Sequence, residues 1–209
     1  VNKYFGDGTP AGVTSAAEVA SKDQLVVATN AAFAPFEYKE GDTYYGVDME
    51  IMAALAESLG KELVISNMEF ESVCTAVAEG MCDVAAAGLT VNETRKQILD
   101  FSDSYYNASQ VLITKADDTT FDACKTVEDV EAILNALTAS DKVGVQTGTT
   151  GQFYVAGDAD WGFAGFPCEC VGYEVGALAA QNILNGNVKY VIIDIAPAKA
   201  IVENINAVN

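Results

Sequence analysis

Apolar runs of strand length alternate with helical segments along the first half of the chain. The runs LVVAT (25–29), ELVISNM (62–68) and CDVAAAG (82–88) predict strands, and the segments at 49–60 and 71–81 predict helices between them. Parallel strands need crossover connections of this kind, because the chain must return to the same edge of the sheet before the next strand begins. The order of these elements therefore predicts a parallel sheet covered by helices.

The first of these helices has a clear period. Ile51, Leu55 and Leu59 recur at four-residue steps, which is the spacing of one face of an α-helix. Gly60 follows directly, and glycine is the residue that most readily ends a helix in the left-handed conformation. We therefore predict a helix that ends at this glycine.

The same alternation restarts in the second half of the chain. Helices are predicted at 126–137, from Gln152, at 176–186 and from Pro197, strands at 142–146 and 190–194, and a strand and turn in WGFAGFP (161–167). We expect residues 1–24 to be a tail or linker, residues 25–110 to form lobe 1 and residues 111–209 to form lobe 2. Two similar lobes joined by an extended segment usually bind a ligand in the cleft between them.

The charge balance excludes several classes of partner and site. The chain has 30 acidic and 11 basic residues and a net charge of −19, so we expect no nucleic-acid partner, because phosphates demand basic patches. Histidine is absent, which removes the Ser-His-Asp and Cys-His catalytic sets and the usual zinc ligand sets. We therefore expect no metal and no cofactor, and we expect the five cysteines to be buried or unpaired thiols.

The only arginine of the chain, Arg95, lies in a polar stretch after the third predicted strand. It falls in the first turn of a helix predicted at Asn92–Leu99, where Thr90 and Glu93 have the spacing of a capping box. A cation gains nothing from the helix dipole at that end, whereas a guanidinium group matches a carboxylate in shape. Two interpretations remain open, a ligand carboxylate and an ion pair with an aspartate of the same segment.

Two features of the second half suit the ends of a small zwitterion. The turn GVQTGTTG (144–151) joins a strand to a helix, where an anion cradle belongs, although it lacks the end of a P-loop and the spacing of a dinucleotide motif. Asp194 ends a strand and could hold an ammonium group or cap the next helix. A cationic fork, an anion-binding turn and a carboxylate are together what a zwitterion requires.

Four stretches resemble the polar amino-acid binding proteins of ABC importers, family 3 of the extracytoplasmic solute-binding proteins. They are VVATNAAFAPFEYKEGDTYYGVDMEIMAALAESLG, VAAAGLTVNETRKQILDFSDSYY, VGVQTGTTG and VIIDIAPAKA, in this order between Leu25 and Val202. The resemblance implies a two-lobed α/β fold of the type II periplasmic-binding-protein kind, with a ligand cleft between lobes joined by a hinge. It also implies a receptor, not an enzyme, that is periplasmic or lipid-anchored at the cell surface and delivers an L-amino acid to an ABC transporter permease.

The resemblance also implies roles for single residues. Arg95 would bind the α-carboxylate of the ligand, with Gly88 and Thr90 at the same floor, and Asp194 would hold the α-ammonium group. The other candidate ligand-binding residues are Phe33 and Phe70, which would sandwich the side chain, Thr149 and Thr150, which would close over the carboxylate, Gln146, which would touch the side chain, and Asn30.

Asn30 departs from the family pattern, because many members have aspartate at this position. An amide offers a donor and an acceptor where a carboxylate would attract a cation. The sequence therefore favours a neutral polar, glutamine-like ligand, with a basic amino acid second. Two alternatives stay open, the amino-acid-sensing domain of a larger receptor and a dehydratase-like enzyme that uses an acid such as Glu37 or Glu174.

The first residues, VNKYFG (1–6), resemble the end of the helix that closes lobe 1 in this family, and the chain stops at Asn209, where the return to lobe 1 is expected. We therefore expect lobe 1 to lack its usual C-terminal closing segment, through permutation, truncation or a tandem array. An incompletely covered lobe exposes unpaired backbone and apolar surface, so a swapped or complementing chain is expected. The alternative is that VNKYFG is an incidental tail.

Overall fold

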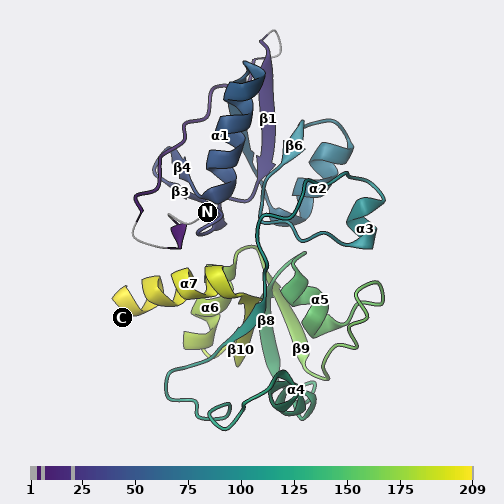
Figure 1. The fold of residues 1–209 in the computed structure, drawn as a ribbon. Helices are drawn as coiled ribbons and strands as arrows, with labels where there is room; N and C mark the ends of the chain where they lie inside the picture. The colour runs from purple at the N-terminus through teal and green to yellow at the C-terminus, as the bar shows by residue number, and fades with distance from the viewer. Residues whose placement is uncertain (1–3, 6–7, 20–21, 209) are drawn as a thin grey trace. The chain divides into compact units, whose positions relative to one another are not determined.

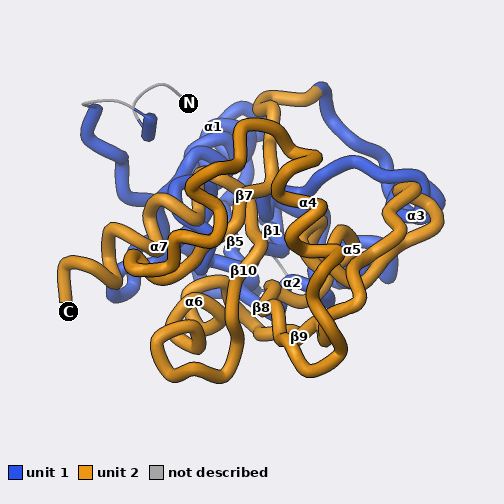
Figure 2. Tube along the Cα trace, turned by 90° about the horizontal axis from the view of Figure 1, so that it is seen from below, with its two compact units in different colours: residues 1–103 blue, residues 104–209 orange. Residues whose placement is uncertain are grey.

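The computed structural model describes residues 4–5, 8–19 and 22–208, and it divides the chain into two compact units (Figures 1 and 2). Unit 1 is Val1–Asp103 and unit 2 is Ser104–Asn209. Both units combine helices with strands. In the part of the chain that is described, no helix has the length and apolar character that crossing a membrane requires.

Unit 1 is built on a parallel sheet. It contains β1 (Gln24–Thr29), β2 (Ala32–Phe33), β3 (Glu37–Glu40), β4 (Thr43–Tyr45), α1 (Val47–Leu59), β5 (Glu62–Asn67), α2 (Phe70–Ala78), β6 (Val84–Ala85) and α3 (Glu93–Lys96). Strands β5, β1 and β6 pair in parallel in that order, whereas β2, β3 and β4 form a separate antiparallel sheet. Helix α1 packs against β1 and β5, and α2 against β1 and β6 (Figure 1). The predicted parallel sheet with helical cover is confirmed.

The two faces of β1 serve two apolar clusters. Val27 is fully buried with Met49 of α1, and Ala28, the next residue, is fully buried with Val73 of α2. Successive side chains of a strand point to opposite faces, so each face of the sheet is covered by one of the two helices. Burial of such side chains stabilises the unit by about 25 cal/mol per Å² of apolar surface.

Helix α1 buries a different face from the one that the leucine spacing indicated. Met49 and Ala56 are buried, at 0% and 2% exposure, whereas Ile51 and Leu59 are 40% and 52% exposed. The predicted end of the helix is confirmed, because Gly60 has a left-handed conformation with a φ of 69°.

Helix α3 is a single turn and is shorter than the predicted helix. Its N-cap is Asn92, whose side-chain oxygen accepts a hydrogen bond from the Arg95 backbone amide at 2.6 Å. The predicted capping box of Thr90 and Glu93 is therefore wrong. Asparagine is at least as good an N-cap as threonine, and the turn begins directly after it.

Unit 2 is a mixed α/β sheet with helices. It contains β7 (Gln110–Ile113), α4 (Val127–Asn135), β8 (Lys142–Gln146), α5 (Thr150–Ala156), β9 (Glu169–Tyr173), α6 (Gly176–Leu184), β10 (Tyr190–Asp194) and α7 (Ile195–Val208). The strand order is β7-β10-β8-β9, in which β7 is antiparallel to β10 and the other pairs are parallel. Val143, Val145 and Tyr190 lie at the centre of its core, fully buried.

The strand predicted in WGFAGFP is wrong in position. Asp158 and Phe163 form an isolated bridge within a turn, and the strand β9 follows at Glu169–Tyr173. Trp161 lies in that turn and stacks on Phe163, with ring centroids 5.6 Å apart and planes at 18°. The aromatic residues that suggested a strand therefore pack on one another in a local loop.

Residues 8–19, which were expected to belong to a tail or linker, are part of unit 1. Val13 forms a bridge with Tyr44 and is 8% exposed. The Ser15 hydroxyl accepts a hydrogen bond from the Ile65 amide at 2.8 Å. Of the VNKYFG stretch, Tyr4 and Phe5 belong to the described residues, and residues 1–3 and Gly6 lie outside them.

Candidate functional site

The candidate residues of unit 1 follow the carboxyl ends of its parallel strands. Asn30 follows β1, Phe70 lies after β5, and Gly88 lies after β6. Strand pairing places these ends at one edge of the sheet, because Thr29 is opposite Asn67 and Ala28 is opposite Ala85. The carboxyl edge of a parallel sheet is where α/β proteins usually bind ligands.

Arg95 lies against two other candidate residues. Its Nη1 donates a hydrogen bond to the Thr90 carbonyl at 2.7 Å, and its guanidinium carbon lies 5.6 Å from the centre of the Phe70 ring. The side chain is half-buried, and this burial lowers the pKa of the guanidinium group. A guanidinium stacked on an aromatic face keeps its edge in a defined plane, which suits bidentate recognition of a carboxylate.

Gly88 turns the chain beside two buried acids. Its φ is 57° and its amide donates a hydrogen bond to Asp48 Oδ2 at 2.8 Å. A Cβ at this position would lie 3.3 Å from the Phe33 ring and 3.7 Å from Glu37 Oε1. Glu37 and Asp48 are 0% and 1% exposed. Sequence reasoning did not identify this pair of acids as part of the floor; the available signal was their position in the quoted PFEY and GVD stretches.

Asn30 holds two strand ends together. The side chain is 8% exposed, and Nδ2 donates a hydrogen bond to the Met68 carbonyl at 2.8 Å. The neighbouring Ala31 amide donates to Asn67 Oδ1, also at 2.8 Å. The loop that leads from β1 to Phe33 is thereby fixed to the loop that leads from β5 to Phe70.

In unit 2 the candidate residues also lie at a carboxyl edge. Strands β8 and β10 are parallel, with Val145 opposite Ile192, so Gln146 and Asp194 end at the same edge. Gln146 is 1% exposed and its Nε2 donates to the Glu174 carbonyl at 3.3 Å. The turn after it begins α5: Thr149 is the N-cap, and Thr150 is the first helical residue.

The hydroxyl of Thr149 points back into this turn. It donates a hydrogen bond to the Gln146 carbonyl at 2.7 Å, and the side chain makes no capping hydrogen bond to α5. The first amides of a helix are orphan donors that can bind an anion. Within the turn, the Gly148 amide donates a hydrogen bond to Gln152 Oε1 at 2.6 Å.

Asp194 carries the carboxylate of this edge. It is half-buried at the end of β10, opposite Gln110 of β7. Burial raises the pKa of the Asp194 carboxyl, and a hydrogen bond from Gln110 opposes that rise. A cationic ligand group would favour the ionised form. Gln110 was not among the candidate residues, and no motif in the sequence singled it out.

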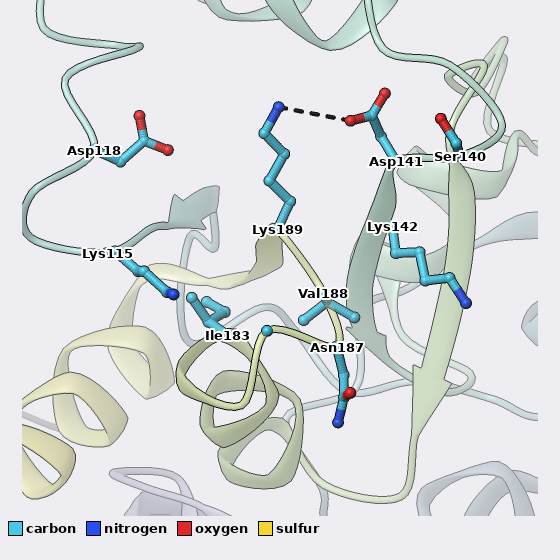
Figure 3. A pocket seen from close by; sticks show the side chains of 10 residues that line it. Lys115, Asp118, Ser140, Asp141, Lys142, Ile183, Asn187, Val188 and Lys189 are labelled. Atoms are coloured by element: carbon cyan, nitrogen blue, oxygen red, sulfur yellow. Dashed lines mark ion pairs between the residues drawn. The ribbon is translucent and has the colours of Figure 1, made fainter.

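A separate pocket of unit 2 lies at the opposite edge of its sheet (Figure 3). It has a volume of about 560 Å³, and its lining includes Lys115, Lys142 and Lys189. Lys189 forms an ion pair with Asp141 at 3.6 Å (Figure 3). None of the candidate residues lines this pocket, which lies where β8 and β10 begin rather than where they end.

The described residues contain no metal-binding cluster and no disulfide. No cluster of three or more Cys, Asp or Glu side chains in that part of the chain has the geometry of a metal site. The five cysteines all lie in it as free thiols. The candidate residues form two groups, one in each unit.

The chain matches a known protein family over most of its length. Residues 25–200 match the bacterial extracellular solute-binding proteins, family 3. The arginine-binding extracellular protein ArtP of Bacillus subtilis (strain 168) is 38% identical over 109 residues, which cover 52% of this chain and 43% of ArtP. The chain therefore spans less than half the length of that relative.

Two solved structures share the fold over most of the chain. The ancestral amino acid-binding protein AncCDT-1, a precursor of cyclohexadienyl dehydratase, has a TM-score of 0.72 and 29% identity, covering 88% of this chain and 75% of its own. An ancestral arginine-binding protein bound to glutamine has a TM-score of 0.69 and 31% identity, with coverage of 88% and 75%. These likenesses confirm the predicted two-lobed α/β fold of the type II periplasmic-binding-protein kind.

The family match extends over most of the chain, from the start of β1 to the middle of α7. Its members are extracellular proteins, which confirms the predicted extracytoplasmic location. The recognised motifs lie inside the matched range, at the carboxyl edges described above. The chain therefore belongs to the bacterial extracellular solute-binding proteins, family 3.

Proposed function

We propose that this protein is an extracytoplasmic receptor that binds one free L-amino acid and delivers it to an ABC importer. The observation that carries this proposal is a pair of opposite charges, each half-buried beyond the carboxyl edge of its own sheet. Arg95 presents a guanidinium group in unit 1, and Asp194 presents a carboxylate in unit 2. A free amino acid has the two complementary charges, a carboxylate and an ammonium group.

The other candidate residues complete the proposed site. In unit 1, Gly88 and Thr90 lie beside Arg95 and are assigned to the ligand carboxylate. In unit 2, Thr149 and Thr150 begin α5 and are assigned to the same ligand group. Phe33 and Phe70 enclose the ligand side chain, and Asn30 and Gln146 hydrogen-bond to its polar end. Buried polar groups favour a ligand that satisfies their hydrogen bonds.

For the ligand we propose a neutral polar amino acid such as glutamine, with basic amino acids second. Asn30 supports a neutral group, because an amide can both donate and accept a hydrogen bond. ArtP is named for arginine, and the ancestral arginine-binding protein was solved with glutamine. Related proteins thus bind arginine or glutamine, and the charge of the side chain at position 30 is a physical basis for selectivity between these two ligands.

A thermal-shift screen against the common L-amino acids tests the proposal. A ligand at 100 times its dissociation constant stabilises the folded protein by about 2.7 kcal/mol, so the best ligand gives a clear rise in melting temperature. We expect glutamine-like side chains to give the largest rise. A protein that responds to no amino acid would contradict the receptor function.

Replacing Asn30 with aspartate is expected to move selectivity towards arginine by about tenfold or more, where tenfold corresponds to about 1.4 kcal/mol. The cause is the new carboxylate at the side-chain end of the site. Calorimetry with glutamine and arginine measures the ratio. The matched control is Asn185→Asp, which makes the same change at an exposed position of unit 2. A wild-type protein that already prefers arginine tenfold would show that another acid sets the charge.

An enzyme is the second candidate function. It is favoured by the likeness to AncCDT-1, the precursor of a cyclohexadienyl dehydratase, and by the buried Glu37 beside Gly88, since such chemistry needs a positioned acid. Incubation with a cyclohexadienyl substrate separates the two functions. Amino-acid binding without product formation supports the receptor, whereas turnover supports the enzyme.

We also propose that a second copy of this chain complements unit 1. A groove of about 480 Å³ beside α2 has a mixed lining, in which apolar side chains such as Met68 and Met81 lie among polar and acidic ones such as Glu71, and Met81 is 61% exposed. The parallel sheet ends at β6, a strand of two residues. Exposed apolar surface beside an open strand edge attracts another chain.

Sedimentation velocity at micromolar concentration measures this association. We expect a dimer, because pairing at the β6 edge would cover the groove in both copies. Met81→Glu should shift the equilibrium towards monomer, and Val208→Glu, at an 81% exposed position of unit 2, is the control. A stable monomer that binds ligand normally would contradict the association.

A further inference from the structure

Tyr4 and Phe5 contact a part of unit 1 that is far away in sequence. The Tyr4 hydroxyl donates a hydrogen bond to Glu50 Oε1, 46 residues along the chain, and accepts one from the Gly46 amide at 3.2 Å. The Phe5 ring lies edge-on to the Phe36 ring, with centroids 6.0 Å apart and planes at 62°. The two side chains thus contact the start of α1 and the segment directly before β3.

The ring contacts continue from Phe5 towards the candidate ligand site. Phe36 stacks on Phe33 with a centroid distance of 6.2 Å and planes at 29°, and both rings are buried, at 4% and 8% exposure. Phe33 in turn lies against Gly88. Phe5 is 46% exposed, so the row of rings runs from the surface to the floor of the proposed site.

The hydrogen bond between the Gly46 amide and the Tyr4 hydroxyl lies close to the Phe36 backbone. Gly46 has a φ of 125°, and a Cβ there would lie 2.0 Å from the Phe36 carbonyl oxygen. The Asp48 amide also donates a hydrogen bond to that oxygen, at 2.9 Å. Only glycine allows this close approach, and the Tyr4 hydroxyl binds the Gly46 amide at the same turn. Tyr4 therefore fixes the backbone, and Phe5 the ring, of one residue, Phe36.

We propose that Tyr4 and Phe5 are positioning residues that hold Phe36 and, through it, the Phe33 wall of the amino-acid site. The proposal deepens the proposed function and rests on it for the meaning of that wall. Phe33 is assigned to the ligand side chain and not to its α-groups. Loss of the support is therefore selective: it reduces discrimination between side chains more than it reduces binding of the amino-acid backbone.

The physical basis is the loss of rotational freedom in a packed row of rings. An aromatic pair contributes beyond the surface that it buries, through its edge-to-face geometry. Removing Phe5 uncovers Phe36 and permits other ring positions for Phe36 and Phe33. Burial and Glu50 raise the pKa of the Tyr4 hydroxyl, so Tyr4 keeps the proton that it donates throughout the neutral range.

The first experiment compares ligand affinities. Phe5→Ala in the full chain is expected to weaken binding of the best amino-acid ligand by about threefold to tenfold. Binding of free glycine, which has no side chain for the wall to touch, should weaken by less than twofold. Phe5→Tyr keeps the ring and should restore wild-type affinities. Tyr4→Phe removes the hydroxyl contacts alone and should give a smaller loss in the same direction.

The second experiment needs no ligand. Hydrogen exchange of the ligand-free protein should be faster in Phe5→Ala than in wild type for the amides of Asp48 and Gly88, and unchanged in unit 2. This result stands even if the wild type binds no amino acid, in which case the proposed function fails and the positioning role survives. Unchanged exchange at both amides would overturn the proposal, and so would an equal loss of affinity for every amino acid.

Discussion

Calorimetry of the Arg95→Ala variant is expected to show amino-acid binding weakened by about 2–5 kcal/mol, because truncation leaves the ligand carboxylate without its charged partner. That loss corresponds to a factor of roughly thirty to several thousand in the dissociation constant. Arg95→Lys should also bind poorly, because lysine carries the charge as a point and lacks the planar fork. The same substitution removes the guanidinium group that lies over the Phe70 ring, 5.6 Å from its centre.

The adjacent residue provides the control. Lys96 lies in the same helical turn, its side chain is 51% exposed, and it forms an exposed ion pair with Glu93 at 2.8 Å. Exposed pairs contribute little, so Lys96→Ala should bind like the wild type. The turn itself should persist in both variants, because its cap is the Asn92 side chain on the backbone amide of residue 95. Normal binding by Arg95→Ala, with α3 intact, would remove the basis of the proposed function.

Replacing Asp194 with asparagine is expected to have opposite effects on binding and on stability. Binding should weaken by about 2–5 kcal/mol, because the ligand ammonium loses its counter-charge. The ligand-free protein, in contrast, should be at least as stable as the wild type near neutral pH. Burial raises the pKa of the Asp194 carboxyl, so the folded state disfavours the ionised form that neutral pH imposes.

The pH dependence follows from the direction of that shift. A raised pKa in the folded state gives a stabilising contribution that is complete below the unfolded pKa of about 3.9. The contribution is lost as pH rises through the higher folded value. Any advantage of Asp194→Asn over wild type should therefore be present near neutral pH and should vanish in acid. Urea denaturation at several pH values, without ligand, measures the difference in the free energy of unfolding.

Asp141 is the matched control, because its pKa shift has the opposite sign. Hydrogen bonds from the Thr138 amide and hydroxyl, at 2.8 and 2.9 Å, lower the pKa of the Asp141 carboxyl. Asp141→Asn should therefore destabilise the protein near neutral pH and leave ligand binding unchanged. If Asp194→Asn destabilised the ligand-free protein as Asp141→Asn does, Asp194 would have a structural role. Unchanged binding would remove it from the site.

The sequence predicted the central strands well and the helix faces less well. The strands at Lys142–Gln146 and Tyr190–Asp194 have the predicted bounds, and all but one residue of each is buried, as in strands covered on both faces. The face of α1 was wrong, since its long side chains Ile51 and Leu59 are partly exposed while Ala56 is buried. Side-chain size does not identify the buried face when small residues are needed for close packing against a sheet.

Strand β9 shows another reason why a prediction from the sequence was wrong. This strand, ECVGY, lies at the edge of the sheet, and none of its residues is fully buried. Edge strands need not be apolar on both faces, so their sequences lack the signal that marks β8 and β10. The aromatic stretch before it attracted the prediction because aromatic residues are enriched in strands.

The motifs in the sequence predicted only the part of the candidate site that lies at strand ends. They indicated residues at strand ends, and the structure places those residues at two carboxyl edges. The support beneath them was not predictable, because buried acids such as Glu37 and Asp48 are rare and have no hydrophobic period. Gln110 was missed for a different reason: its position opposite Asp194 depends on an antiparallel pairing between segments far apart in the chain.

The tryptophan that stacks on Phe163, Trp161, gives a fluorescence signal from unit 2 alone. The chain has a single tryptophan, and that tryptophan lies in unit 2, in the turn closed by the bridge between Asp158 and Phe163. Its emission therefore reports the packing of one unit, whereas circular dichroism sums the helices of both. Unfolding curves from the two signals coincide only when the whole chain unfolds in one step. Fluorescence and circular dichroism together therefore show whether the two units unfold cooperatively.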